Sequence, residues 1–216
     1  MKKYVAVAGN IGVGKSTLVE MLCVRLGWEP FYEPVKENPY LVDFYSDMSA
    51  WSFHSQVFFL ARRLRSHYRL GQHPNSVVQD RSVYEDAEIF AQNLYLQGHI
   101  SQRDYQTYRE LYETTTRLLP PPDLVVYLQA SHDVVMSRIA QRGRDYERAM
   151  PPEYISALNE AYNYFFFHYT SAPLLIVNTN QTDFVNDPAA VTDLLKRIKE
   201  HEGGTVYYTP LAGGNS

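Results

Sequence analysis

The 216-residue sequence contains a single cysteine, Cys23, so it cannot form an internal disulfide framework and suits a reducing compartment. No apolar run approaches the length of a membrane span, and residues 1–8 lack the features of a signal peptide. Excess positive charge is also missing, because 20 basic residues stand against 24 acidic ones for a formal net charge of −4. That balance argues against a broad basic surface for nucleic acid. We therefore expect a cytoplasmic protein that binds neither membrane nor nucleic acid.

What the sequence does have is an alternation of short β-rich segments and longer helical patterns, which is typical of a parallel sheet with helical crossovers. The expected strands are residues 4–8, 29–32, 76–79, 124–129 and 174–177. The expected helices are residues 15–25, 51–70, 84–97, 103–119, 133–141, 152–169 and 188–201. The prediction is a single α/β domain over residues 1–202 with a five-stranded parallel sheet. We expect the glycine-rich residues 203–216 to form a flexible tail, of which residues 206–208 could dock.

The strongest local signal follows the first expected strand. Residues 9–17 fit the phosphate-binding pattern G-x-x-x-x-G-K-[ST] between a strand and a helix. Glycines let backbone N–H groups close around the phosphates of a nucleotide, Lys15 can reach the β- and γ-phosphates, and Ser16 can bind Mg²⁺. The expected nucleotide-binding residues are Gly9, Asn10, Ile11, Gly12, Val13, Gly14, Lys15, Ser16 and Thr17. The alternative is a glycine-rich turn that only starts a helix.

Charged side chains follow two further strands, at the sheet edge where ligands bind in such folds. Glu33 ends the second strand and is placed to accept a proton. Asp80 and Arg81 follow the third strand, where an acid can serve a metal ion and a guanidinium can stabilise charge on a transferring group. The alternatives are a solvated turn glutamate and a structural Asp–Arg ion pair.

A cluster of arginines lies at the end of the helix expected over residues 133–141. Arg138 and Arg142 share a helix face, Gly143 permits a turn, and Arg144 follows. Guanidinium groups this close repel one another unless phosphate or carboxylate groups join them. Residues 138–150 are therefore predicted to form a lid over a triphosphate, the alternative being a basic helix C-terminus.

Together these segments resemble the deoxynucleoside kinases, in the branch of deoxyguanosine, deoxycytidine and bacterial deoxyadenosine kinases. The resemblance has motif support from the phosphate-binding loop to about Glu147 and extends more loosely to about residue 200. The matching segments are residues 9–17, Glu33-Pro-Val35, Glu37-Asn-Pro-Tyr40, Trp51-Ser-Phe-His-Ser-Gln56, Asp80-Arg-Ser-Val-Tyr84 and Arg142-Gly-Arg144. Each alone is a modest signal, whereas their order and spacing together are highly specific.

The resemblance implies a P-loop kinase that transfers the γ-phosphoryl group of ATP, with Mg²⁺, to the 5′-hydroxyl of a deoxynucleoside. Glu33 matches the family's general base, and Arg81 matches the residue that contacts the 5′-oxygen and the incoming phosphoryl group. Asp80 occupies the acidic position beside the magnesium ion, where several family members have glutamate. Whether Glu33 or Asp80 takes the proton stays open. Lys15 completes the expected catalytic set, and Ser16 with Asp80 the expected metal set.

The resemblance also implies a nucleoside pocket. Tyr45 and Glu147 match the positions that hold the sugar 3′-hydroxyl. Gln56 resembles the amide that makes a bidentate contact with the base edge, and Phe90 resembles the aromatic residue that stacks on the base. The lid arginines Arg138, Arg142 and Arg144 would complete the triphosphate site.

One residue pair bears on which base is accepted. Arg63 and Asp86 match the Arg–Asp pair of the purine- and cytosine-accepting branch, whereas thymidine-favouring kinases generally have smaller or apolar residues there. This match favours deoxyguanosine or deoxyadenosine. The alternative is that Arg63 belongs to a basic helix and Asp86 to an acidic helix start. Asn38 stands where higher-organism relatives often have tryptophan, which leaves pocket shape and base choice open.

Two other functions stay open. A nucleoside monophosphate kinase of the thymidylate kinase type shares the loop, the acid–Arg pair and the lid, and a non-kinase nucleotide-binding switch shares the loop alone. Family members are usually homodimers through two long helices, which implies a dimer here through residues 51–70 and 84–97. The apolar residues of these helices fit an interface or an internal core equally well; they are Phe58, Phe59, Ile89 and Leu94.

Overall fold

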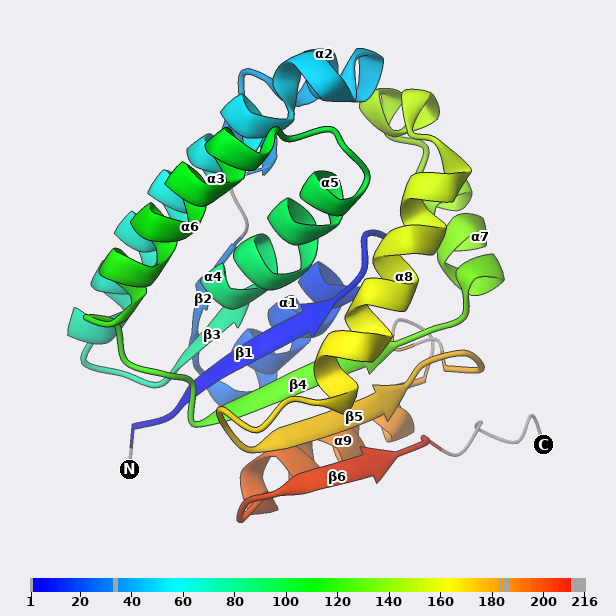
Figure 1. Cartoon of the computed structure of the whole chain (residues 1–216). Coiled ribbons are helices and arrows are strands. Elements are labelled where there is room, and N and C mark those ends of the chain that lie inside the picture. Colours follow the sequence, from blue (N-terminus) through cyan, green and yellow to red (C-terminus); the bar gives the residue numbers. More distant parts are fainter. Residues whose placement is uncertain (1, 33–34, 183, 185–186, 211–216) are drawn as a thin grey trace.

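The computed structural model describes residues 2–32, 35–182, 184 and 187–210. Its six strands are all parallel and lie in the order β2-β3-β1-β4-β5-β6 (Figure 1). The strands are β1 (Tyr4–Gly9), β2 (Glu29–Phe31), β3 (Val77–Asp80), β4 (Leu124–Gln129), β5 (Leu174–Asn178) and β6 (Thr205–Tyr208). The chain crosses over between each strand and the next in sequence, as parallel strands require.

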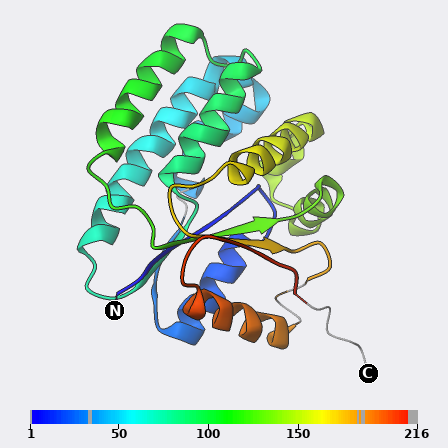
Figure 2. The same ribbon diagram turned by 60° about the horizontal axis from the view of Figure 1, so that its bottom comes forward.

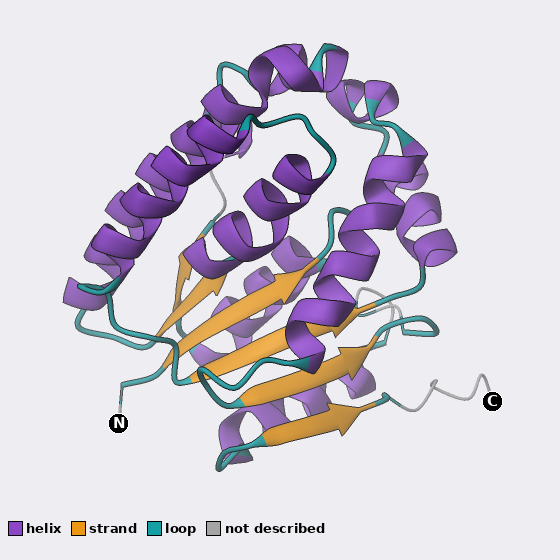
Figure 3. Ribbon diagram, viewed as in Figure 1, coloured by secondary structure: helices purple, strands orange, loops and turns teal. Residues whose placement is uncertain are grey.

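Helices cover both faces of this sheet (Figure 3). The helices are α1 (Lys15–Leu26), α2 (Leu41–Ser46), α3 (Met48–Gln72), α4 (Val83–Glu85), the π-helix η2 (Asp86–Ala91), α5 (Gln92–Leu96), α6 (Gln102–Thr116), α7 (His132–Arg142), α8 (Pro152–Phe167) and α9 (Pro188–Glu200). Figure 2 shows α1 and α9 on one face, while α3, α5, α6 and α8 lie on the other. Short 3-10 turns occupy Val35–Glu37 and Asp145–Ala149.

The central strand β1 is buried along its whole length because helices cover both of its faces. Val5 and Val7 are fully buried, and burial of a valine side chain contributes about 1.5–3 kcal/mol. β1 pairs with β3 on one side and β4 on the other, with Val7 opposite Asp80. This register places the loop after β1 beside the turn after β3, so both open at the same edge of the sheet.

The prediction of an α/β fold is confirmed, and the five expected strands all occur with ends within one residue of those expected. The count of five is wrong, because residues Thr205–Tyr208 form a sixth strand beside β5. These residues were expected in a flexible tail; residues 211–216 of that tail lie outside the described part of the chain. None of the described helices combines the length and apolar character needed to cross a bilayer.

Three helical features depart from the sequence pattern. α3 starts at Met48, earlier than expected, because the side chain of Asp47 caps it by accepting a hydrogen bond from the Ala50 N–H at 3.1 Å. α2 was not expected at all. The helix expected over residues 84–97 is interrupted by the π-helix η2, and π segments of this kind are frequent at functional sites.

Candidate active site

A cavity of about 960 Å³ opens at the carboxyl edge of the sheet, and it brings most of the predicted site residues together. Those in its lining are Ile11, Gly12, Val13, Gly14, Lys15, Ser16, Thr17, Tyr45, Gln56, Asp80, Arg81, Asp86, Phe90, Arg138, Arg142, Arg144 and Glu147. Gly9, Asn10 and Arg63 are not part of the lining. Glu33, the expected general base, lies outside the described residues.

The phosphate-binding loop packs closely on its neighbours at two glycines. A Cβ atom on Gly9, which has φ +146°, would approach the Leu128 carbonyl oxygen to 2.8 Å. A Cβ atom on Gly12, at φ +82°, would approach the Cγ1 atom of Ile139 to 2.6 Å. Both positions therefore require glycine for conformation and for space. Inside the loop the Lys15 ammonium donates to the carbonyls of Gly9 and Asn10, each at 2.9 Å.

The end of β3 meets the loop through a short polar contact. The Ser16 hydroxyl donates a hydrogen bond to Asp80 Oδ2 at 2.6 Å. Asp80 is buried, and its Oδ1 atom has no hydrogen-bond partner among the described residues. A buried carboxylate oxygen without a partner, beside a hydroxyl oxygen, fits Mg²⁺, which takes oxygen ligands. No described group of three His, Cys, Asp or Glu side chains could hold a metal, which is compatible with Mg²⁺ because it commonly uses one or two carboxylates and substrate phosphates.

Arg81 adopts a rare backbone conformation directly after β3. Its φ of +64° lies in the left-handed region, which is costly for a residue with a side chain and is concentrated at functional sites. The turn is held by a hydrogen bond from the Arg81 N–H to the Val7 carbonyl at 3.0 Å. The guanidinium carbon lies 4.3 Å from the centroid of the Phe90 ring, and Nη1 donates to the Tyr162 hydroxyl. Arg81 is thereby fixed in the cavity wall between β1 and η2.

Glu85 is a buried acid that no sequence motif assigned to the site. Its carboxylate accepts hydrogen bonds from the Ser82 N–H at 2.8 Å, the Tyr162 hydroxyl at 2.9 Å and the Gly9 N–H at 3.2 Å. Burial raises the pKa of Glu85, while Arg81 and the hydrogen bond from Ser82 oppose that rise. The Ser82…Glu85 spacing of a capping box could have placed it at a helix start. Its contact with Tyr162, 77 residues away, has no sequence signal.

The opposite end of the cavity is enclosed mainly by apolar and aromatic side chains. Four of these side chains come from α2, α3 and α8 and were not predicted as site residues: Leu41, Phe44, Phe59 and Tyr154. Gln56 and Phe90, the expected base contacts, are both buried and both face this space. Asn38 does not line the cavity; its Nδ2 donates to the Ser55 hydroxyl at 2.9 Å, and its Oδ1 accepts the Tyr40 N–H at 3.0 Å. The result is an apolar slot with the Gln56 amide in its wall, which suits a planar heterocycle.

Arg63 and Asp86 form a buried ion pair, with Arg63 Nε 2.9 Å from Asp86 Oδ2. Asp86 lines the cavity and Arg63 lies behind it. Arg63 also donates through Nη1 to the Asp80 carbonyl at 2.9 Å. The pair therefore presents a carboxylate to the ligand space and connects it to the turn that carries Arg81.

The arginines of the expected lid have protein partners here. Arg142 makes a two-pronged contact with Glu147, including Nε to Oε2 at 3.2 Å. Arg144 lies 3.8 Å from the same carboxylate and donates to the Tyr146 hydroxyl at 2.8 Å. The Tyr146 ring lies nearly parallel to that of Tyr45, with centroids 6.3 Å apart. Glu147, expected to contact a sugar, thus neutralises the guanidinium groups expected to contact phosphates.

Arg138 differs from the other two lid arginines. Its guanidinium donates to the carbonyls of Val13, Thr179 and Thr182 at 3.1, 2.7 and 3.1 Å. These bonds join α7 to the phosphate-binding loop and to the segment after β5. Arg138 lines the cavity from this position, in which its guanidinium binds backbone carbonyls.

A phosphate-binding loop and an apolar slot thus share one cavity at the edge of a parallel sheet, and together they define a nucleotide-binding phosphotransferase. The deoxynucleoside kinase family model matches residues 5–202. The deoxyadenosine/deoxycytidine kinase of Bacillus subtilis is 37% identical over 196 residues, which cover 90% of each chain. A deoxyguanosine kinase of Lactobacillus johnsonii is 34% identical, again over 90% of each chain.

A solved structure of deoxyadenosine kinase from M. mycoides with bound dATP is similar in fold, with a TM-score of 0.80 and 30% identity over 92% of this chain and all of that one. The chain belongs to the deoxynucleoside kinase family. It is a transferase that phosphorylates deoxynucleosides, as the resemblance of its sequence motifs implied.

Proposed function

We propose that this enzyme transfers the γ-phosphoryl group of ATP, with Mg²⁺, to the 5′-hydroxyl of a purine deoxynucleoside. The observation that carries the proposal is one shared cavity, in which Lys15, Ser16 and Asp80 line one end and Gln56 and Phe90 the other. A donor triphosphate and an acceptor nucleoside bound at these ends would meet beside Arg81. Structural relatives that bind dATP, dCMP and dCDP support a site for nucleotides of this size.

In the proposed reaction the chain's own groups orient the phosphates and move one proton. Lys15 and the loop N–H groups bind the β- and γ-phosphates, and Arg81 stabilises charge on the phosphoryl group as it passes between oxygens. Glu33 accepts the 5′-hydroxyl proton while the new O–P bond forms and ADP leaves. The Ser16–Asp80 contact supports placing Asp80 on the metal side, which leaves Glu33 as the proton acceptor. The oxygens of Ser16 and Asp80 would hold Mg²⁺, which when bound would neutralise charge on the phosphates.

The proposed purine preference is supported by the buried Arg63–Asp86 pair. Asp86 lines the cavity, where a carboxylate can accept hydrogen bonds from exocyclic or ring N–H groups of a base. We expect Asp86, with Arg63 paired behind it, to leave too little room for a 5-methyl pyrimidine. Relatives that act on deoxyadenosine and on deoxyguanosine are among the similar proteins, in agreement with this preference.

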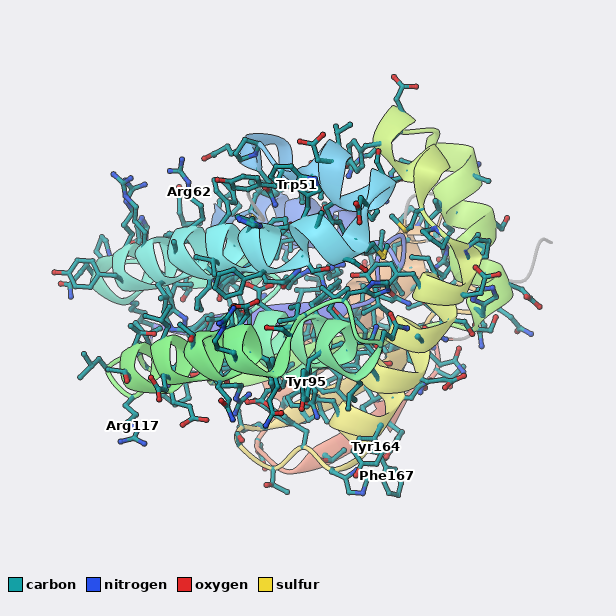
Figure 4. The ribbon with its side chains drawn as sticks, turned by 45° about the horizontal axis from the view of Figure 1, so that its top comes forward. Trp51, Arg62, Tyr95, Arg117, Tyr164 and Phe167 are labelled. Atoms are coloured by element: carbon teal, nitrogen blue, oxygen red, sulfur yellow. The ribbon has the colours of Figure 1, made fainter. Side chains whose placement is uncertain are left out.

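We also propose that the enzyme is a cytoplasmic homodimer of nucleotide salvage. The sequence expectation of an interface that includes residues 84–97 needs revision, because Ile89 and Leu94 are fully buried inside the chain. α3 and α6 lie side by side as an outer layer, and Figure 4 shows them turned toward solvent. The exposed Leu111 and Tyr68 on these helices support an interface there, which sedimentation of the purified protein would test.

The function is tested by a phosphoryl-transfer assay with ATP and Mg²⁺ against deoxyguanosine, deoxyadenosine, deoxycytidine, thymidine and thymidine monophosphate. We expect the highest catalytic efficiency with one or both purine deoxynucleosides. A preference for deoxycytidine or thymidine would contradict the purine assignment. Turnover confined to the monophosphate, or ATP hydrolysis that needs no acceptor, would contradict the proposed acceptor.

A further inference from the structure

Two buried side chains connect the phosphate-binding loop to Arg81, although neither lines the cavity. Glu85, in α4, and Tyr162, in α8, are both fully buried. The Tyr162 hydroxyl accepts a hydrogen bond from Arg81 Nη1 and donates one to Glu85 Oε1 at 2.9 Å. The same Glu85 oxygen accepts the Gly9 N–H at 3.2 Å. A continuous path of hydrogen bonds therefore runs from the guanidinium to the first residue of the loop.

The direction of each hydrogen bond on this path is determined by chemistry. A guanidinium only donates, and an ionised carboxylate only accepts. The single proton of the Tyr162 hydroxyl must then point to Glu85, which leaves its lone pairs for Arg81. The hydroxyl is the one group on the path that has to do both, so phenylalanine at position 162 would break the path at a single atom.

Arg81 needs such support because its side chain is long and its backbone lies in a sparsely populated conformation. Phe90 offers the guanidinium a ring face 4.3 Å away, but a cation–π contact constrains its orientation only weakly. A hydrogen bond from Nη1 to a rigidly packed hydroxyl fixes that orientation. Tyr162 is rigid because its ring stacks with Tyr127, centroids 6.0 Å apart and 7° from parallel.

We propose that Glu85 and Tyr162 are positioning residues for phosphoryl transfer, which hold the Arg81 guanidinium at a fixed place relative to the phosphate-binding loop. This inference rests on the proposed role of Arg81 in the transfer. The Glu85 carboxylate is held in place because it accepts hydrogen bonds from the Gly9 N–H in the loop and from the Ser82 N–H at the start of α4. Tyr162 transmits that position to the guanidinium.

The test is Tyr162→Phe, with Tyr127→Phe as its matched control. Both tyrosines are buried and stack on each other, but the Tyr127 hydroxyl donates to Asn163 Oδ1 at 3.0 Å, away from Arg81. We expect Tyr162→Phe to lower kcat by about 10- to 100-fold, the order expected when a reacting group is displaced by up to an ångström. KM for ATP and for the deoxynucleoside should change little, because Tyr162 does not line the cavity. The control should keep kcat near the wild-type value with a similar loss of melting temperature.

Combination with Arg81→Lys separates positioning from a general effect on folding. If Tyr162 acts through the guanidinium, Tyr162→Phe should have little further effect on kcat once Arg81 is lysine. Equal kcat losses in Tyr162→Phe and the control, or losses that multiply fully in the double variant, would overturn the inference. Glu85→Gln should reproduce the kcat loss, since an amide cannot accept hydrogen bonds at both of its ends. If Arg81→Lys alone keeps full activity, the proposed role of Arg81 fails instead.

Discussion

Arg81 and the two lid arginines Arg142 and Arg144 are held in this cavity in different ways. Arg81 is buried and contacts groups that are themselves buried, namely Phe90 and Tyr162. Arg142 and Arg144 in the lid have side chains that are 33% and 38% exposed, and both turn to the carboxylate of Glu147. The first site is arranged before any substrate arrives. The second is arranged around a contact that has to be exchanged if these arginines are to bind phosphates.

This difference follows from what each group would have to do. Charge that develops during transfer is stabilised best by groups that need no reorganisation, which requires buried and fully bonded supports. A lid has to admit substrates, so its arginines need partners that are replaceable. Arg142 and Arg144 are partly exposed, so they can exchange partners, although the Glu147 carboxylate that they contact is itself only 3% exposed. The following experiments test whether the two sites differ in this way.

The largest effect is expected at the proposed base. Glu33→Gln should lower turnover by about 10²–10⁴-fold, because a primary hydroxyl loses its proton acceptor, and should leave ATP binding largely intact. Single-turnover kinetics and ATP titration measure the two quantities separately. Glu29→Gln on β2, an exposed acid on the preceding strand, serves as the control. Near-normal turnover of Glu33→Gln would transfer the proton-acceptor role to Asp80.

Asp80 tests the metal side of the prearranged site. Asp80→Asn should raise the Mg²⁺ concentration for half-maximal activity by about 10- to 100-fold, because the amide loses the charge and one of the two acceptor oxygens. Titration of MgCl₂ at fixed ATP measures this shift. An unchanged Mg²⁺ dependence would show that the Ser16–Asp80 contact is only structural.

Much of the fold could be predicted because its signals are local. The apolar runs of β1 and β4 and the spacing of residues 9–17 specify a strand, a loop and a helix without reference to the rest of the chain. β6 was missed because three of its four residues are exposed at the sheet edge and glycines precede it. Its place comes from pairing with β5, which is a tertiary contact.

The site divides in the same manner. Motif resemblance predicted residues such as Asp80 and Gln56, which line the cavity, because their order along the chain is distinctive. It could not locate Glu85 and Tyr162, which matter through each other and lie on helices far apart in sequence. It also gave no sign that Glu147 would pair with Arg142, since a short stretch of charges permits several pairings.

An intermediate effect is expected at the base-selecting pair. Replacing Arg63 and Asp86 together with alanine should shift the ratio of catalytic efficiencies toward thymidine over deoxyguanosine by about 10-fold, the order that pocket size and a lost polar contact provide. Both residues must change, because a lone buried charge is strongly destabilising. Removal of the Arg63 hydrogen bond to the Asp80 carbonyl could lower activity with every substrate, and such a general loss cancels in the ratio of catalytic efficiencies. An unchanged ratio would reject the pair as a determinant of base choice.

The smallest and most diagnostic effect is expected in the lid. Glu147→Gln weakens the contact that holds Arg142, so KM for ATP should fall by about 5-fold, which corresponds to about 1 kcal/mol. KM for the deoxynucleoside should rise in the same variant, because a carboxylate proposed to hold the sugar hydroxyl is lost. Steady-state kinetics with each substrate varied in turn would resolve these opposite signs. Parallel increases in both KM values would mean that Glu147 supports the lid structurally, and that the lid is as firmly prearranged as the site around Arg81.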